Sequence, residues 1–190
     1  MVIIMTDKSA VAKEYIFEVL EKTGALKFGD FTLASGAKSK YYIDMRIIPN
    51  FPKEFDKLIS EAVKYIKHSC PEIEGVVGIP LAAIPFGTLI ANKLMKPYYI
   101  LRKEPKEHGL MKMVEGEIKQ GQKILLVDDL ISSGFSKVFA IEALRNEGAQ
   151  VTDMFVFIDR TPEGLAEFEQ QYNIKVHYLV NAKEILERAK

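Results

Sequence analysis

Beyond Pro49, short continuous apolar runs alternate with amphipathic helical segments, and this alternation constrains the fold more than any other feature of the sequence. The expected strands cover residues 75–79, 98–101, 123–127, 151–158 and 175–179. The expected helices cover residues 52–68, 85–95, 135–147, 162–172 and 182–189. Strands that are apolar along their whole length and separated by helices are typical of a parallel sheet covered on both faces. The sequence therefore predicts an α/β fold with a central, mostly parallel sheet flanked by helices.

The N-terminal quarter of the chain follows a different pattern. After Asp7, apolar residues recur at helical spacing up to Leu20, and Gly24 stands where a helix would end. Residues 25–48 are rich in glycine, aromatic and β-branched residues, which favours short strands and turns. We interpret residues 1–48 as a small hood on a core of residues 49–190, together forming a single domain.

Composition excludes several classes of protein. The 190 residues include 26 basic and 26 acidic side chains, so no overall field attracts nucleic acid or an acidic membrane. Cys70 is the single cysteine, which rules out an internal disulfide. The apolar N-terminal stretch is too short for a signal peptide or a membrane span. We expect a soluble cytoplasmic protein without nucleic-acid or membrane partners.

The sharpest motif covers residues 124–137, ILLVDDLISSGFSK. An apolar strand leads to Asp128 and Asp129, and Gly134 follows at the start of a helix. Ligands of parallel sheets bind at the carboxyl ends of strands, and a helix start offers unpaired N–H groups to a phosphate. Paired carboxylates suit ribose hydroxyls and a magnesium-bound sugar diphosphate. The alternative is an ordinary connection in which Asp129 or Ser133 merely caps the helix.

A long polar connection, residues 102–121, separates two of the expected strands. Such a long loop is usually either functional or disordered. It carries a cluster of potential cations, namely Arg102, Lys103, Lys106 and His108. These could neutralise a departing diphosphate, and nearby glycines would let the loop move. The alternative is a solvated charged loop, because glutamates are interleaved with the cations.

Residues 124–137 resemble the motif with which type I phosphoribosyltransferases bind 5-phosphoribosyl 1-diphosphate (PRPP), and this resemblance implies their fold. It implies that Asp128 and Asp129 hold the ribose, with Mg²⁺ retained nearby mainly by PRPP and water. The resemblance also implies that the following turn binds the 5-phosphate. The PRPP-binding segment after the acids is then Leu130, Ile131, Ser132, Ser133, Gly134, Phe135 and Ser136.

Residues 102–109, RKEPKEHG, resemble the catalytic loop of orotate phosphoribosyltransferases. In that family the loop of one subunit closes over the site of its neighbour, which implies a homodimer. The implied diphosphate contacts are Arg102, Lys103, Lys106 and His108, and the implied catalytic residues are Lys103, Lys106, His108, Asp128 and Asp129.

Two further segments point toward orotate, and a third points toward the diphosphate. Residues 31–44, FTLASGAKSKYYID, resemble the family's hood and imply that Tyr42 and Ile43 lie against the pyrimidine. Arg160 follows a strand, at the position where orotate enzymes carry an arginine that contacts the base. The resemblance also implies that Ser132 contacts orotate. Residues 78–87, GIPLAAIPFG, resemble the diphosphate loop and predict a cis peptide between Pro80 and Leu81.

The sequence departs from the family at three positions. Bacterial orotate enzymes carry lysines where this chain has Ala34 and Ala82, and Phe135 replaces a frequent Gly or Thr. The predicted activity is transfer of the phosphoribosyl group of PRPP to orotate in pyrimidine biosynthesis. A type I transferase for another base and a PRPP-sensing regulator that binds nucleic acid remain alternatives. The hood argues against the first, and the neutral charge argues against the second.

Overall fold

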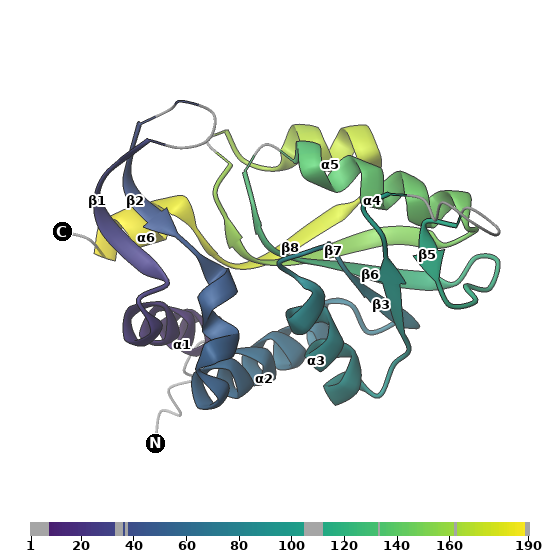
Figure 1. The fold of residues 1–190 in the computed structure, drawn as a ribbon, viewed down its shortest axis with the longest axis horizontal. Helices are drawn as coiled ribbons and strands as arrows, with labels where there is room; N and C mark the ends of the chain where they lie inside the picture. Colours follow the sequence, from purple (N-terminus) through teal and green to yellow (C-terminus); the bar gives the residue numbers. More distant parts are fainter. Residues whose placement is uncertain are drawn as a thin grey trace, which may run out of the picture.

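A computed structural model describes residues 8–32, 36, 38–104, 112–132, 134–161 and 163–188, with the side chains of residues 8–12, 135 and 136 left out of the description. Its centre is a six-stranded sheet with the order β5-β4-β3-β6-β7-β8 (Figure 1). The strands are β3 (Gly75–Gly78), β4 (Tyr98–Leu101), β5 (Val114–Glu115), β6 (Lys123–Ile131), β7 (Gln150–Asp159) and β8 (Lys175–Asn181). All neighbours pair in parallel except β5, which runs antiparallel to β4. The predicted mostly parallel sheet is confirmed.

Helices cover both faces of this sheet (Figure 1). One layer contains α1 (Lys8–Thr23), α2 (Pro52–Ser69) and α3 (Ile84–Leu94), and the other contains α4 (Phe135–Asn146) and α5 (Ala166–Tyr172). α6 (Ala182–Arg188) follows β8 directly. Within the described residues, no helix combines the length and apolar character needed to cross a bilayer.

Alternation along the strands divides the buried residues between two cores. Leu125 and Val127 of β6 pack with α2 and α3, whereas Ile124 and Leu126 of the same strand pack with α4. Successive strand residues point to opposite faces, so a strand buried on both faces needs apolar residues at every position. This requirement explains the continuous apolar runs in the sequence.

The hood consists of two antiparallel strands and a short helix. β1 (Leu26–Thr32) pairs with β2 (Lys38–Ile43), and the 3₁₀ helix η1 (Met45–Asn50) leads into α2. Leu26 and Ile43 are buried in the same core as α1 and α2. The hood therefore packs on the main body through apolar contacts, as a small extension of one core.

The largest differences between the structure and the predicted elements concern β6, β5 and α5. β6 continues to Ile131 instead of ending at Val127, because Leu130 and Ile131 pair with Ile158 and Asp159 of β7. The two aspartates consequently lie inside the strand. The two-residue strand β5 was not predicted, and α5 begins at Ala166, later than the predicted residue 162.

Candidate active site

A pocket of about 440 Å³ opens at the carboxyl ends of β3 and β6. Its lining residues are Ile79, Pro80, Leu81, Ala82, Lys103, Asp128, Asp129, Lys137 and Phe139. Three segments far apart in the sequence thus meet here: the loop after β3, the start of the long polar connection, and the end of β6 with the first turns of α4. This is the place where a parallel sheet commonly binds its ligand.

The two aspartates are held by the backbone around them. Asp128 Oδ1 accepts a hydrogen bond from the N–H of Asp129 at 2.9 Å, and Asp129 Oδ1 accepts one from the N–H of Leu130 at 2.8 Å. The N-cap of α4 is Gly134, which makes no side-chain capping hydrogen bond. Asp129 is therefore not a helix cap, and this alternative from the sequence is wrong for Asp129.

Lys137 neutralises part of the negative charge in the pocket. Its ammonium forms an ion pair with the Asp128 carboxylate, and the two side chains are only 8% and 5% exposed. Burial raises the pKa of Asp129 to about 7, with the neighbouring charge of Asp128 as the second cause. The site therefore contains one carboxylate paired with a cation and one that binds a proton near neutral pH.

The loop after β3 has a tightly constrained backbone. The peptide between Pro80 and Leu81 is cis, which confirms the prediction for this bond. The Ala83 N–H donates to the Ile79 carbonyl at 3.1 Å, and the Gly87 N–H donates to the Ala83 carbonyl at 2.8 Å. A Cβ at Gly78 would lie 2.4 Å from the Ala83 oxygen, so glycine is needed for the loop to fold back on β3.

The turn between β6 and α4 presents part of the predicted phosphate-binding segment. Ser132 is exposed, and Gly134 has a φ of 72°, a conformation that favours glycine. A Cβ at Gly134 would also lie 2.5 Å from the Phe168 ring. The backbone of Phe135 and Ser136 begins α4. Ser133 and the side chains of Phe135 and Ser136 lie outside the description.

The long connection contributes Lys103 to the pocket, and this side chain is exposed. Arg102 instead donates to the Glu115 carboxylate, from Nε at 2.8 Å and from Nη2 at 2.5 Å. This ion pair links the start of the long connection, just after β4, to Glu115 in β5. Lys106 and His108, like Ala34 of the hood, lie outside the described residues.

Arg160 lies where β7 ends and is close to the hood. Its guanidinium carbon is 4.9 Å from the centre of the Tyr41 ring. The backbone N–H of Arg160 donates to the Ile131 carbonyl at 2.8 Å. The Nε atom is buried and has no hydrogen-bond partner among the described residues. The Arg160 guanidinium is thus stacked on Tyr41 and keeps one donor unpaired within the described part of the chain.

The two predicted hood residues point in different directions. Ile43 is buried in the core, and Tyr42 is partly buried with its ring 5.6 Å from that of Phe31. The hood residue in contact with Arg160 is Tyr41, which the sequence analysis missed. Strand alternation offered a signal, because Tyr41 and Ile43 must share one face of β2 while Tyr42 faces the other way.

Lys137 was also missed as a site residue. Lys137 is the last residue of the motif of residues 124–137, which gives it no partner. A lysine in the first turn of a helix interacts unfavourably with the positive end of the helix dipole. This placement could have indicated a specific acidic partner. The partner, Asp128, lies nine residues earlier on the adjoining strand.

Comparison with known proteins gives a consistent result. Residues 45–177 match the family described as the phosphoribosyl transferase domain. The orotate phosphoribosyltransferase of Pyrococcus abyssi is 37% identical over 93% of this chain and 97% of its own length. The protein of the same name from Methanocaldococcus jannaschii is 37% identical over 91% and 96%.

A solved structure agrees with these relatives. The crystal structure of orotate phosphoribosyltransferase from Aeropyrum pernix superposes with a TM-score of 0.79 at 31% identity, covering 90% of this chain and 96% of that one. The resemblance in the sequence motifs is confirmed by whole-chain similarity. The chain therefore belongs to the phosphoribosyltransferase family, in the branch formed by the orotate phosphoribosyltransferases.

Proposed function

We propose that this chain transfers the phosphoribosyl group of PRPP to orotate, giving orotidine 5-phosphate and diphosphate in the biosynthesis of UMP. The observation that carries this proposal is the pocket shared by Asp128, Asp129, Lys103 and the loop after β3. It combines acceptors for a sugar with a cation for a diphosphate. The names of the relatives supply orotate as the second substrate.

PRPP is proposed to lie along the carboxyl end of β6. Asp128 and Asp129 accept hydrogen bonds from the ribose hydroxyls, and the turn of residues 132–136 holds the 5-phosphate with its backbone N–H groups. The exposed Ser132 and the conformation of Gly134 support this placement. The diphosphate then points toward Lys103 and the loop after β3.

Catalysis requires stabilisation of two charges that separate. The leaving diphosphate gains negative charge while the ribose carbon becomes cation-like, so cations are needed at one end and carboxylates at the other. We assign Lys103 to the diphosphate, together with Arg102, Lys106 and His108 of the same connection. Orotate is itself an anion, so its nitrogen needs no strong general base.

Magnesium fits the donors in the pocket. Mg²⁺ prefers oxygen ligands and commonly retains water, and Asp128 and Asp129 offer carboxylate oxygens at the pocket wall. We propose that PRPP and water hold most of the ion, with the two aspartates nearby. When bound, the ion would offset the charge of the diphosphate.

Orotate is proposed to bind between the hood and Arg160. The buried Nε of Arg160 lacks a hydrogen-bond partner among the described residues, and a carboxylate or carbonyl oxygen would satisfy it. Stacking on Tyr41 holds the guanidinium in place. Ser132, Tyr42 and Ile43 complete the proposed base-binding set, with Ile43 acting from the core behind it.

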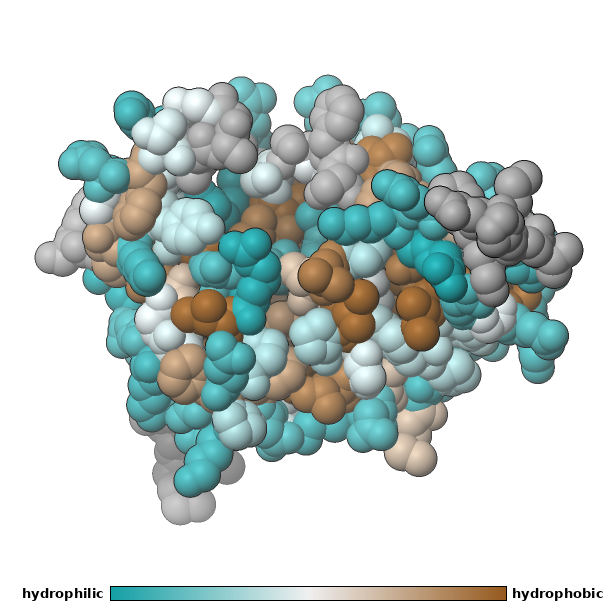
Figure 2. Space-filling view, viewed as in Figure 1, coloured by the Kyte–Doolittle hydropathy of each residue, from teal (hydrophilic) through white to brown (hydrophobic). Residues whose placement is uncertain are grey.

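A homodimer that shares the long connection is part of the proposal. Leu81, in the loop before α3, is 73% exposed. Ile100, in the neighbouring strand β4, is 50% exposed. Figure 2 shows hydrophobic residues gathered over the middle of the face that carries α3. Such side chains would be covered by a second subunit.

We further propose a cytoplasmic enzyme without nucleic-acid or membrane partners, in keeping with its zero net charge.

The direct test is the loss of orotate absorbance after PRPP and Mg²⁺ are added to the purified chain. A panel of adenine, hypoxanthine, uracil and orotate separates the orotate enzyme from a transferase for another base. A gel shift with RNA and DNA at several salt concentrations tests for a regulator. Turnover restricted to orotate is expected, and turnover of another base alone would overturn the proposed substrate.

A further inference from the structure

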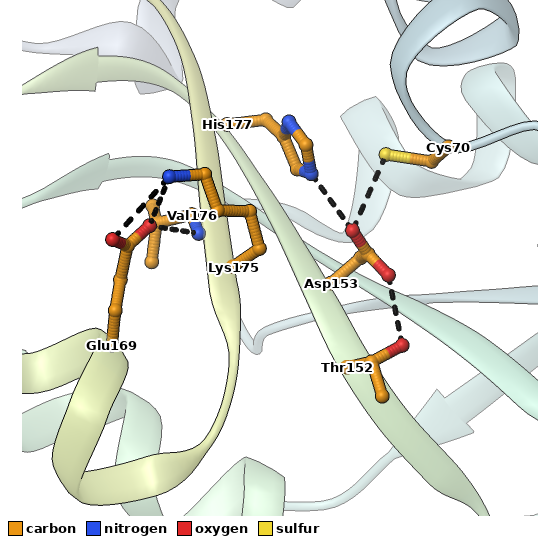
Figure 3. A network of polar contacts seen from close by, with 7 residues as sticks. All are labelled: Cys70, Thr152, Asp153, Glu169, Lys175, Val176 and His177. Carbon is orange, nitrogen blue, oxygen red and sulfur yellow. Dashed lines mark hydrogen bonds and ion pairs between the residues drawn. The ribbon is translucent and has the colours of Figure 1, made fainter.

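A second cluster of reactive side chains lies at the opposite end of the sheet. Cys70 ends α2 as its C-cap, Asp153 lies near the start of β7, and His177 lies near the start of β8 (Figure 3). The active-site aspartates instead lie near the end of the parallel strand β6. The cluster therefore has no part in the proposed transfer reaction.

The three donor atoms already converge on one point. His177 Nε2 is 2.8 Å from Asp153 Oδ1, and Cys70 Sγ is 3.8 Å from the same oxygen. All three donor atoms lie within 4.8 Å of one another. Tetrahedral zinc with ordinary bond lengths separates such donors by roughly 3.3–3.6 Å. Adjustments of about 1 Å would complete that geometry.

Surrounding contacts orient the donors toward one another. The Thr152 hydroxyl donates to Asp153 Oδ2 at 2.8 Å, which leaves Oδ1 directed at Cys70 and His177 (Figure 3). The Tyr65 ring packs edge-on against the His177 ring, with centroids 6.1 Å apart. Hydrogen bonds and packing of this kind commonly hold metal ligands in position.

An ion could enter the cluster from solvent. A pocket of about 220 Å³ is lined by Cys70, Thr152 and Asp153, together with the ion pair of Glu72 and Lys123. Asp153 and His177 are only partly buried. The cavity reaches the cluster on the side of Cys70 and Asp153, and water on that side would be the fourth ligand, as in open zinc sites.

The donor types select the class of metal. A thiolate and an imidazole suit zinc and related transition metals, whereas magnesium and calcium prefer oxygen ligands. Burial raises the pKa of the Cys70 thiol to about 12, and the charge of Asp153 contributes further. A cation between the two groups would replace the thiol proton and remove this repulsion.

We propose that Cys70, Asp153 and His177 form a binding site for one Zn²⁺ ion or a similar divalent transition metal. The ion would tie the C-terminal end of α2 to β7 and β8, far from the transfer site. It would stabilise the packing of α2 on the sheet. The competing explanation is that Asp153 only joins His177 and Cys70 by hydrogen bonds.

Cobalt is a suitable probe because its spectrum reports the ligands. We would titrate Co²⁺ into the full chain after chelator treatment, with its thiol reduced. One equivalent should produce thiolate-to-metal charge-transfer absorption and the visible bands of a tetrahedral site, and Zn²⁺ should displace both. Metal bound at Asp128 and Asp129 would give no thiolate band, so the two sites are distinguishable.

Two variants make the test specific. Cys70→Ser should abolish the thiolate band and weaken Zn²⁺ binding by about 100-fold, while orotate turnover with Mg²⁺ stays within about twofold of wild type. His68→Gln, at an exposed histidine near the same helix end, should retain the band. A wild-type spectrum without the thiolate band would overturn the proposal, even if Cys70→Ser failed to fold. Persistence of the band in a folded Cys70→Ser protein would overturn it as well.

Discussion

The Lys137 ammonium contacts the Asp128 carboxylate inside the candidate active-site pocket, and both side chains are almost fully buried. Ala82, which replaces a lysine of the bacterial orotate enzymes, lines the same pocket. Lys137 therefore places a cation in the region from which the family lysine is missing. It also offsets the negative charge of Asp128, which would otherwise repel the adjacent carboxylate of Asp129.

Replacing Lys137 with methionine keeps much of the volume but removes the charge. The Asp128 carboxylate would be left buried without its cation, so the free energy of unfolding should fall by about 3 kcal/mol. The KM for PRPP should rise by about tenfold or more, because the pocket loses positive charge. Urea denaturation and initial rates measure the two effects. Lys137→Arg, which keeps the charge, is the matched control; equal behaviour of the two variants would contradict a role for the ion pair.

Asp129 links stability to pH. Its pKa is about 7 in the folded protein and 3.8 as the ordinary value, so the folded state binds this proton more tightly than the unfolded state. The resulting stabilisation is complete below about pH 4 and disappears as the pH rises through 7. The Asp129→Asn variant has no titratable group at this position, so it loses this pH dependence. Its free energy of unfolding should therefore rise relative to wild type by about 3 kcal/mol between pH 5 and pH 8.

Urea denaturation of both proteins at the two pH values checks the sign of this effect. Orotate turnover should be lost in Asp129→Asn at either pH, because the amide is a poorer acceptor for ribose hydroxyls. A stability difference that did not change with pH would show that burial does not raise the pKa of Asp129. Asp30→Asn, at an exposed hood carboxylate, provides a comparison for general charge effects.

Periodicity predicted the main helices and the sheet because each buried face requires apolar residues at a fixed spacing. It placed the end of β6 too early, since Asp128 and Asp129 interrupt the apolar run while their backbone continues to pair with β7. Backbone pairing does not depend on side-chain polarity, so hydropathy could not reveal it. The two-residue strand β5 is too short for any periodic signal.

The candidate site could be predicted from the sequence where a local motif contains its residues, but not where distant segments meet. The twin aspartates and Lys103, which line one pocket, and the cis bond after Pro80 all lie within short motifs of the sequence. The contacts of Lys137 with Asp128 and of Arg160 with Tyr41 depend on packing between elements. A local pattern can indicate that such a residue has a partner, but it does not say which residue that partner is.

Lys103 provides a test of the catalytic role proposed for the long connection. Its side chain lines the pocket and is exposed, so Lys103→Ala should lower kcat by about 100-fold with little change in the free energy of unfolding. Steady-state rates with saturating PRPP and orotate measure the loss. Lys96→Ala, at an exposed lysine at the other end of the sheet, should behave as wild type. An unchanged kcat for Lys103→Ala would remove this residue from the mechanism.

Arg160 and Tyr41 should act together on orotate. The guanidinium stacks 4.9 Å above the Tyr41 ring and offers a buried Nε donor with no partner among the described residues. Arg160→Lys keeps the charge but loses the planar pair of donors and the stacked surface. The KM for orotate should therefore rise by about 30-fold, corresponding to roughly 2 kcal/mol, while the KM for PRPP changes little.

Substitutions at Tyr41 separate the ring from the hydroxyl. Tyr41→Phe retains the ring beneath the guanidinium, so its KM for orotate should stay close to that of wild type. Tyr41→Leu keeps an apolar side chain in the core but removes the aromatic surface, and its KM for orotate should rise about threefold to tenfold. Since Tyr41→Leu acts only by positioning Arg160, it should add little to Arg160→Lys in the double variant. Fully additive effects would mean that Tyr41 and Arg160 contribute to orotate binding independently.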